Sequence, residues 1–207
     1  MRTARQPVGI SRSLIQWRFT PCSNTRIAKL DAPDSPFDAI ILARAGMVRL
    51  GWGPRITRDL GPPTILYAVS QGALAIEIRA DDDAARALCA SIAHWPTEWS
   101  CYAERACLRL LEGGCSVPVG VHSELREREG ARGGELELTG CVTSLDGKKH
   151  VEHTLKREVS SLGEAEALGK DLANVLMERG AREILDDIKE DREKKIKLSQ
   201  AAEATAA

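Results

Sequence analysis

Apolar residues recur with helical spacing from Thr97 to Leu111. One broad face of this segment carries Trp99, Ala103, Ala106, Cys107, Leu110 and Leu111. Such a stripe predicts an amphipathic helix that packs against a core. Gly113 and Gly114 follow, and glycine is common after a helix because it accepts a positive φ.

Three later segments have the pattern of β-strands: 117–121, 135–143 and 149–158. Asp146-Gly147 lies between the last two and predicts a tight hairpin. Ser161 and Glu164 form a capping box. The helix that they open ends near Gly180, and its inner face carries Leu168, Leu172, Val175 and Leu176. We therefore expect a C-terminal α+β domain over residues 95–182, with a three-stranded antiparallel sheet covered on one face by helices at 97–111 and 161–179.

The pattern before residue 95 predicts alternating helices and strands. Short helices are expected at 25–30 and 45–50, and a longer one at 81–93. Apolar, β-branched runs predict strands, the first of them buried, at 37–43, 65–69 and 73–79. Gly61-Pro62-Pro63 is a connector. Residues 24–94 are therefore expected to be α/β in fold class, with a mixed or parallel sheet.

The two ends of the chain differ from the middle in charge. Residues 1–30 hold six basic residues and no acid. Two interpretations stay open: an organelle transit peptide, or a misassigned start of the gene, in which case residues 1–23 are disordered. Residues 183–207 form a charged tail with one apolar stripe at Ile184, Leu185 and Ile188. We expect a solvated helix with a frayed end there, and a partner-binding helix is the alternative.

Overall composition excludes several classes of protein. The 207 residues include 29 Lys+Arg and 30 Asp+Glu, and 43% are hydrophobic. A nearly neutral chain of this kind is expected to be globular and not to bind nucleic acid through general basicity. No run approaches the ~18 apolar residues of a membrane span. None of the six cysteines forms C-x-x-C, so no metal site is expected. We expect mostly reduced, buried cysteines in a cytoplasmic protein.

The candidate chemistry centres on Cys115. It follows the predicted end of a helix and two glycines, so we expect it on an exposed turn. A thiol there could serve as a nucleophile or as an attachment point. His94 and His122 are the closest histidines in the sequence, so a Cys–His catalytic site has little support.

The residues around this cysteine resemble a known family. Ala103-Glu104-Arg105-Ala106, followed by Leu111-Glu112-Gly113-Gly114-Cys115-Ser116-Val117-Pro118, is very similar to the signature of porphobilinogen deaminase, also called hydroxymethylbilane synthase. The segments at 24–31, 37–43 and 68–74 resemble further parts of that family. The resemblance is continuous from Asn24 to about Ala181.

This resemblance implies an activity and a set of site residues. The family enzyme joins four porphobilinogen molecules, with release of ammonia, into linear hydroxymethylbilane for haem and other tetrapyrroles. Cys115 would hold a dipyrromethane cofactor through a thioether. By motif, Arg26 and Arg49 would contact carboxylates of cofactor or substrate, and Gln71 and Gly46 would lie near the cofactor. The implied enzyme is a cytoplasmic monomer that acts on a small molecule, without nucleic acid or membrane.

The resemblance also implies an absence. Family members carry a further domain, and part of a second, before the helix at Asn24, and that part holds the catalytic aspartate. The 23 residues that precede Asn24 here do not resemble it. We therefore assign no catalytic residue and expect the chain to be inactive alone. The alternative is a non-catalytic fragment or interaction module that keeps the cofactor-attachment domain. Residues 24–94 would be the remnant of a domain, with uncovered apolar surface and poor solubility.

Overall fold

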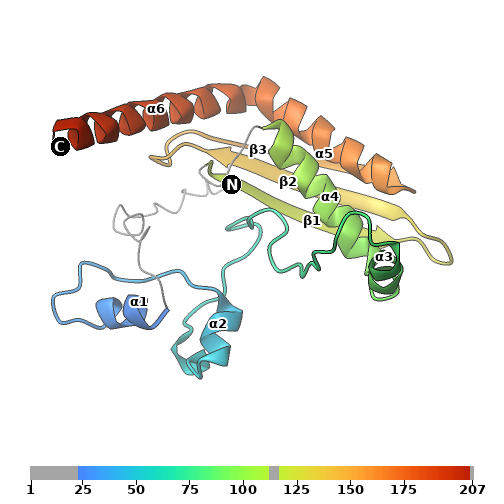
Figure 1. Cartoon of the computed structure of the whole chain (residues 1–207), viewed down its shortest axis with the longest axis horizontal. Coiled ribbons are helices and arrows are strands. Elements are labelled where there is room, and N and C mark those ends of the chain that lie inside the picture. Colours follow the sequence, from blue (N-terminus) through green and yellow to red (C-terminus); the bar gives the residue numbers. More distant parts are fainter. Residues whose placement is uncertain (1–22, 112–116, 206–207) are drawn as a thin grey trace, which may run out of the picture. The chain divides into compact units, whose positions relative to one another are not determined.

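The computed structural model describes residues 23–111 and 117–205 (Figure 1). They belong to two compact units, divided between residues 60 and 61. The disorder expected over residues 1–23 falls outside the described residues, except at Ser23, which begins the first helix. No helix in the described ranges is both long enough and apolar enough to cross a membrane.

The first unit is built from short helices joined by irregular segments. α1 (Ser23–Leu30) and α2 (Arg44–Arg49) confirm the two helices predicted there, and a 3-10 turn, η2 (Gly53–Arg55), follows. Ile27 and Met47 are buried. Arg55 donates from Nη1 and Nη2 to the two carboxylate oxygens of Asp31, at 2.8 and 2.5 Å. This bidentate pair fixes the chain after α1 against η2.

The buried strand predicted at 37–43 is wrong. These residues have no regular structure up to the start of α2, and Ile41 is 54% exposed. A strand is stable only where its N–H and C=O groups pair with a neighbouring strand. Among the described residues no segment pairs with this one.

The second unit contains an antiparallel sheet in the order β1-β2-β3. Its strands are β1 (Val119–Glu127), β2 (Gly134–Thr143) and β3 (His150–Val159). The Asp146-Gly147 hairpin sets the register of β2 against β3, with Cys141 opposite Glu152. This confirms the predicted sheet, although β1 begins two residues later than expected and is longer.

Two helices, α4 (Trp95–Leu110) and α5 (Leu162–Leu176), cover one face of this sheet (Figure 1). A Cβ built at Gly140 would meet Leu172 and Leu176 of α5 at 3.1 and 3.2 Å, which identifies the covered face. Side chains alternate across a strand, so the even-numbered residues of β2 face the helices and the odd-numbered ones face away. The core lies between the layers: Trp99, Ala103, Cys107, Leu111, Leu136, Leu138, Val142, Leu168, Leu172 and Leu176. Leu110, predicted on the inner face of its helix, is 39% exposed.

The capping box at the start of α5 is present. Ser161 Oγ accepts a hydrogen bond from the N–H of Glu164 at 3.2 Å. The Glu164 carboxylate in turn accepts from the N–H and the hydroxyl of Ser160, at 2.6 and 2.9 Å. These bonds satisfy backbone donors that a helix start leaves unpaired.

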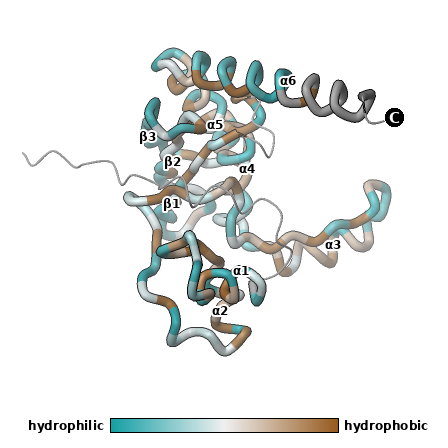
Figure 2. The backbone as a smooth tube through the Cα atoms, turned by 90° about the vertical axis from the view of Figure 1, so that its left-hand side faces the viewer, coloured by the Kyte–Doolittle hydropathy of each residue, from teal (hydrophilic) through white to brown (hydrophobic). Residues whose placement is uncertain are grey.

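The charged tail is less solvated than the sequence predicts. Gly180, within η3 (Met177–Ala181), has a φ of 109°, and α6 (Arg182–Thr205) starts in a new direction after it. Ile184 and Ile188 are 2% and 7% exposed, so the first turns of α6 belong to the core. In Figure 2 this part of α6 alternates between hydrophilic and hydrophobic colours, as one apolar stripe requires.

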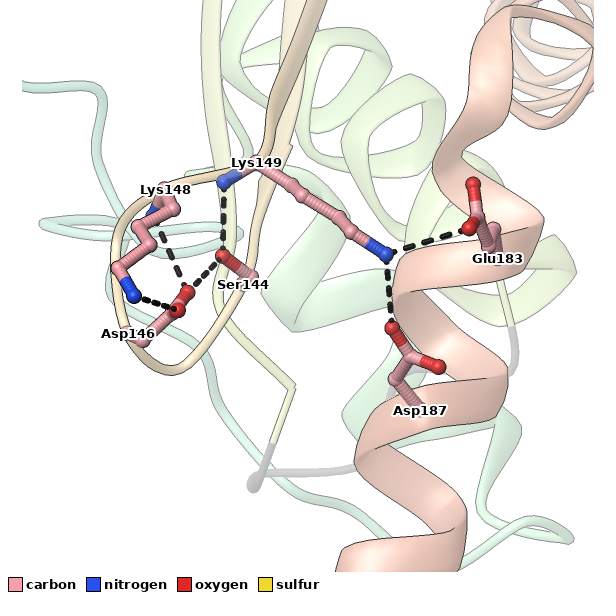
Figure 3. A network of polar contacts seen from close by, with 6 residues as sticks. All are labelled: Ser144, Asp146, Lys148, Lys149, Glu183 and Asp187. Carbon is pink, nitrogen blue, oxygen red and sulfur yellow. Dashed lines mark hydrogen bonds and ion pairs between the residues drawn. The ribbon is translucent and has the colours of Figure 1, made fainter.

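An ionic contact joins α6 to the β2–β3 hairpin. Lys149 Nζ lies 3.2 Å from the Glu183 carboxylate and 3.0 Å from that of Asp187 (Figure 3). The hairpin itself is closed by Ser144 and Asp146, whose side chains bond each other at 2.6 Å. Both groups of contacts are exposed to solvent, so each adds little to the free energy of folding. Their main effect is to fix the orientation of the hairpin.

The strands predicted at 65–69 and 73–79 do not form. Only Tyr67 pairs, through a single antiparallel bridge to Val121, and 73–79 has no regular structure. Leu74 is 100% and Ile76 62% exposed. Uncovered apolar surface was predicted at 37–43 and 65–69, where Ile41 is 54% and Tyr67 42% exposed; the poor solubility expected from it stays a prediction. α3 (Asp83–Ala90) is shorter than the predicted helix, and Asp82 caps it by accepting from the Ala85 N–H.

Candidate functional site

Cys115 lies outside the described residues, so its role as the attachment residue stays a prediction. The structure does describe the elements that flank it. α4 ends at Leu110, and Leu111, 1% exposed, anchors that end in the core. On the other side, β1 starts at Val119. The segment that carries Cys115 therefore connects α4, in the helical layer, to β1, in the sheet that this layer covers.

Gly46 and Arg49 lie together on α2, in the first unit. Residues three apart share one side of a helix. Apart from its chain neighbours and the backbone of its own helix, no atom of the described residues lies within 4 Å of a Cβ built at Gly46. Arg49 is exposed. Arg49 forms no ion pair with any residue that the structure describes, whereas Arg44 of the same helix pairs with Asp59. Met47, buried beside them, holds α2 in place. This side of α2 thus offers a guanidinium next to open backbone.

Arg26 lies on α1 of the same unit and is half-buried, one residue before buried Ile27. Its backbone position is therefore fixed by the packing of α1. Gln71 lies in the second unit, so the predicted site residues are divided between the two units.

Gln71 is exposed on a turn that Glu104 holds. The N–H of Ser70 donates to Glu104 Oε2 at 2.7 Å, and the hydroxyl of Ser123 donates to Glu104 Oε1 at 2.6 Å. Ser70 has a φ of 58° and Gly72 one of 89°, so the chain reverses tightly around Gln71. One carboxylate in the middle of α4 therefore positions this turn against β1.

In the sequence, Glu104 stands out only as one residue of the family signature, and its positioning role was not predicted. Its position offers one signal of that role, because Glu104 directly follows Ala103, which faces the core. An acidic residue at the border of an apolar helix face needs donors from a neighbouring segment.

The described cysteines are all free: Cys89, Cys101, Cys107 and Cys141. Cys107 and Cys141 are buried, as predicted, and the other two are half-buried. Burial, together with the nearby Glu104 carboxylate, raises the pKa of the Cys107 thiol to about 12. Cys107 is therefore a packing residue that cannot serve as a nucleophile at neutral pH.

Comparison with known proteins gives two family matches along the chain. Residues 19–87 match the family model described as porphobilinogen deaminase, dipyromethane cofactor binding domain. Residues 99–178 match the one described as porphobilinogen deaminase, C-terminal domain.

Curated relatives named porphobilinogen deaminase agree with these matches. The protein from Debaryomyces hansenii is 44% identical over 79% of this chain and 44% of its own length. The relative from Yarrowia lipolytica is 45% identical over 79% of this chain and 47% of its own. That from Nostoc sp. is 48% identical over 80% of this chain and 48% of its own. The chain thus spans about half the length of the curated relatives it matches. Two models of one family, which together match most of the chain, and relatives at this level of identity show that the chain belongs to the porphobilinogen deaminase family.

Proposed function

We propose that these residues belong to a hydroxymethylbilane synthase, a transferase that condenses four porphobilinogen molecules with release of ammonia. The observation that carries this proposal is the order of the two family matches along one chain, with the cofactor-binding domain before the C-terminal domain. The chain would supply the cysteine that holds the dipyrromethane cofactor, and part of the surface that binds carboxylates. We further propose that the protein is a monomer in the cytoplasm. The free cysteines of the described residues suit this reducing compartment.

The side of α2 formed by Gly46 and Arg49 is the described surface that best fits the cofactor and substrate. Porphobilinogen carries two carboxylates, and a guanidinium pairs with a carboxylate through two parallel hydrogen bonds. Arg49 has its donors available among the described residues, and the open space above Gly46 lets a planar group approach the backbone. Arg26 would add a second guanidinium from α1 of the same unit. In the second unit, Gln71 would offer the cofactor an amide from its exposed turn.

Cys115 would hold the cofactor through its sulfur atom. When bound, that group supplies the pyrrole end to which new units are added. The thiol must be deprotonated to form the thioether. Cys115 follows two glycines in the sequence, and we expect these residues without side chains to let a bulky group approach the sulfur. Glu104 would act at a distance, because it positions the turn that carries Gln71.

A second function remains open: a non-catalytic module that keeps the attachment cysteine. The family's catalytic aspartate, as the resemblance implies it, has no counterpart in these 207 residues. The fully exposed Leu74 and the exposed Ile76 also form a surface that suits a protein contact. We therefore expect these residues alone to lack turnover.

Intact-protein mass spectrometry after incubation with porphobilinogen separates these functions. A covalent dipyrromethane adduct that is lost in Cys115→Ser and kept in Cys101→Ser supports the attachment role. Hydroxymethylbilane, assayed in the same samples, reports turnover. An adduct without turnover supports the module. Turnover would show that the 207 residues form a working enzyme. Absence of any adduct on a folded chain would overturn the role of Cys115.

The carboxylate surface needs its own test. Arg49→Gln removes the guanidinium and keeps the helix. We expect adduct formation at limiting porphobilinogen to slow by roughly 10–100-fold, the range for one lost hydrogen bond to a charged group. Arg58→Gln is the matched control, because Arg58 is also exposed in the first unit and has no ion pair with a described residue. Equal rates for the two variants would refute the role of Arg49.

A further inference from the structure

Three side chains with metal-binding atoms gather on the sheet face that α4 and α5 leave uncovered. Cys141 of β2 lies opposite Glu152 of β3, and His150 lies two residues before Glu152, opposite Thr143. One ligand atom from each of Cys141, His150 and Glu152 lies within 4.8 Å of the other two. All three belong to the rigid ladder of one antiparallel pair, so the backbone fixes their spacing.

Hydrogen bonds around these side chains orient them. Thr143 Oγ1 lies 2.8 Å from His150 Nδ1, and Gly120 of β1 lies opposite Cys141 in the sheet. The hydroxyl has one proton. If it points that proton away from the ring, it accepts from Nδ1–H, and a neutral imidazole then keeps its lone pair on Nε2. Partners of this kind fix the tautomer and orientation of metal-binding histidines.

The remaining contact brings two acceptors together. His150 Nε2 lies 3.5 Å from Glu152 Oε2, and in the tautomer above neither atom carries a proton. A cation placed among the ligand atoms would relieve the repulsion between these two acceptors.

Neighbouring acids on the same sheet face already have cationic partners. Glu137 pairs with Lys156 at 2.6 Å, and Glu135 lies 3.7 Å from Arg126. In the part of the chain that the structure describes, Glu152 pairs with no lysine or arginine, only with His150. Glu152 therefore differs from Glu135 and Glu137, because no described lysine or arginine balances its negative charge.

We propose that Cys141, His150 and Glu152 bind a divalent metal ion of the zinc class, with water as the fourth ligand. Sulfur, imidazole and carboxylate together favour zinc or cobalt over calcium or magnesium, which prefer oxygen. Three protein ligands with one open position is a common zinc arrangement. Gly120 leaves space for the Cys141 sulfur itself, because a Cβ at Gly120 would lie 2.9 Å from that sulfur and 2.9 Å from the Cβ of Leu66. On metal binding the thiol loses its proton to solvent and the sulfur–metal bond forms.

Cobalt(II) titration of the full chain tests this site. The chain carries Cys22→Ser and Cys115→Ser, so that only thiols of the described part contribute. At about pH 7.5, above the usual histidine pKa of about 6.5, we expect a thiolate-to-cobalt charge-transfer band and the weak visible bands of a tetrahedral ion. Zinc should displace the cobalt stoichiometrically, and an excess of magnesium or calcium should not.

Four variants identify the ligands and their support. Cys141→Ser should abolish the charge-transfer band. Glu152→Gln, on the exposed face and compatible with the fold, should weaken cobalt binding by about tenfold or more. Thr143→Val should weaken it by roughly 10–100-fold through loss of the hydrogen bond to His150. Cys101→Ser, which removes another half-buried free thiol, should bind as the parent does.

Two results would overturn the proposal. One is a folded parent chain that shows no thiolate–cobalt band. The other is unchanged cobalt affinity in Glu152→Gln, which would mean that the carboxylate only pairs with a protonated His150. Circular dichroism of each variant confirms the fold and separates lost binding from lost structure.

Discussion

Gly169 of α5 lies directly against the backbone of Ala103 of α4. A Cβ built on Gly169 would overlap the carbonyl oxygen of Ala103 and lie 3.0 Å from the Cβ of Ala106. Both helices are buried here, since Ala103 is 0% exposed. The close approach of α4 and α5 over the sheet therefore depends on a residue without a side chain.

Replacing Gly169 should separate the two helices. We expect Gly169→Ala to lower the free energy of unfolding by about 1–3 kcal/mol or more, the range for overpacking a close contact. Gly163→Ala is the matched control on the same helix, because the nearest atom to its new Cβ would be Ser161 Oγ at 4.0 Å. There the better helix propensity of alanine should raise stability by about 0.5–1 kcal/mol. Urea unfolding followed by circular dichroism measures both, and equal shifts would contradict the close contact.

The start of α6 should behave as part of the core. Ile184 is 2% exposed and Ile196 46%, so the same truncation tests two places on one helix. Ile184→Ala should cost about 2–4 kcal/mol from lost burial and the cavity left behind. Ile196→Ala should change stability by less than about 0.5 kcal/mol. A small effect at both positions would show that α6 does not pack on the domain.

Glu104 should control the turn around Gln71. Glu104→Ala leaves the N–H of Ser70 and the hydroxyl of Ser123 without their acceptor, which should cost about 1–3 kcal/mol. Glu104→Gln keeps one carbonyl oxygen and should cost less. Hydrogen exchange at the Ser70 amide should accelerate in the alanine variant and much less in the glutamine variant. Glu98→Ala, on the exposed first turn of α4, serves as the control for losing a carboxylate from this helix. Unchanged exchange at Ser70 would refute the positioning role.

The C-terminal sheet and helices could be predicted because their signals are local. Asp146-Gly147 specifies the hairpin, and Ser161 with Glu164 specifies a helix start within four residues. The strand predicted at 37–43 depended on a partner segment that no local pattern can supply. Burial of Ile184 was missed for a similar reason, because it depends on the direction that the chain takes after Gly180.

The candidate metal ligands could not be predicted either, because no local sequence pattern brings them together. Cys141 and Glu152 share no motif, and only the β2–β3 register places them opposite each other. Cysteine spacing alone therefore indicated no metal site. The family signature around Cys115, by contrast, is contiguous in sequence, so it could identify the family before any contact was known.

Burial of Cys107 should make the folded chain sensitive to alkali. Its pKa is raised from an ordinary value of 9.0 to about 12, chiefly by burial. Between these pH values the unfolded chain has lost the thiol proton and the folded chain keeps it, so the folded state binds more protons. Stability is therefore complete below about pH 9 and falls as the pH rises, by up to about 1.4 kcal/mol per pH unit from this group.

Cys107→Ala isolates this contribution from other groups that titrate in alkali, such as Lys149, whose pKa its carboxylate partners raise. We compare urea unfolding of the two chains from pH 7 to about pH 10.5, a range that spans the ordinary thiol pKa of 9.0. The variant should be less stable at neutral pH, because it leaves a small cavity. The difference between the chains should stay constant below about pH 8 and shrink above about pH 9, as the parent pays the cost of keeping a proton that the unfolded thiol releases. A difference that stays constant over the whole range would show that Cys107 ionises as easily in the folded chain as in the unfolded one, and that solvent reaches the space between α4 and the sheet.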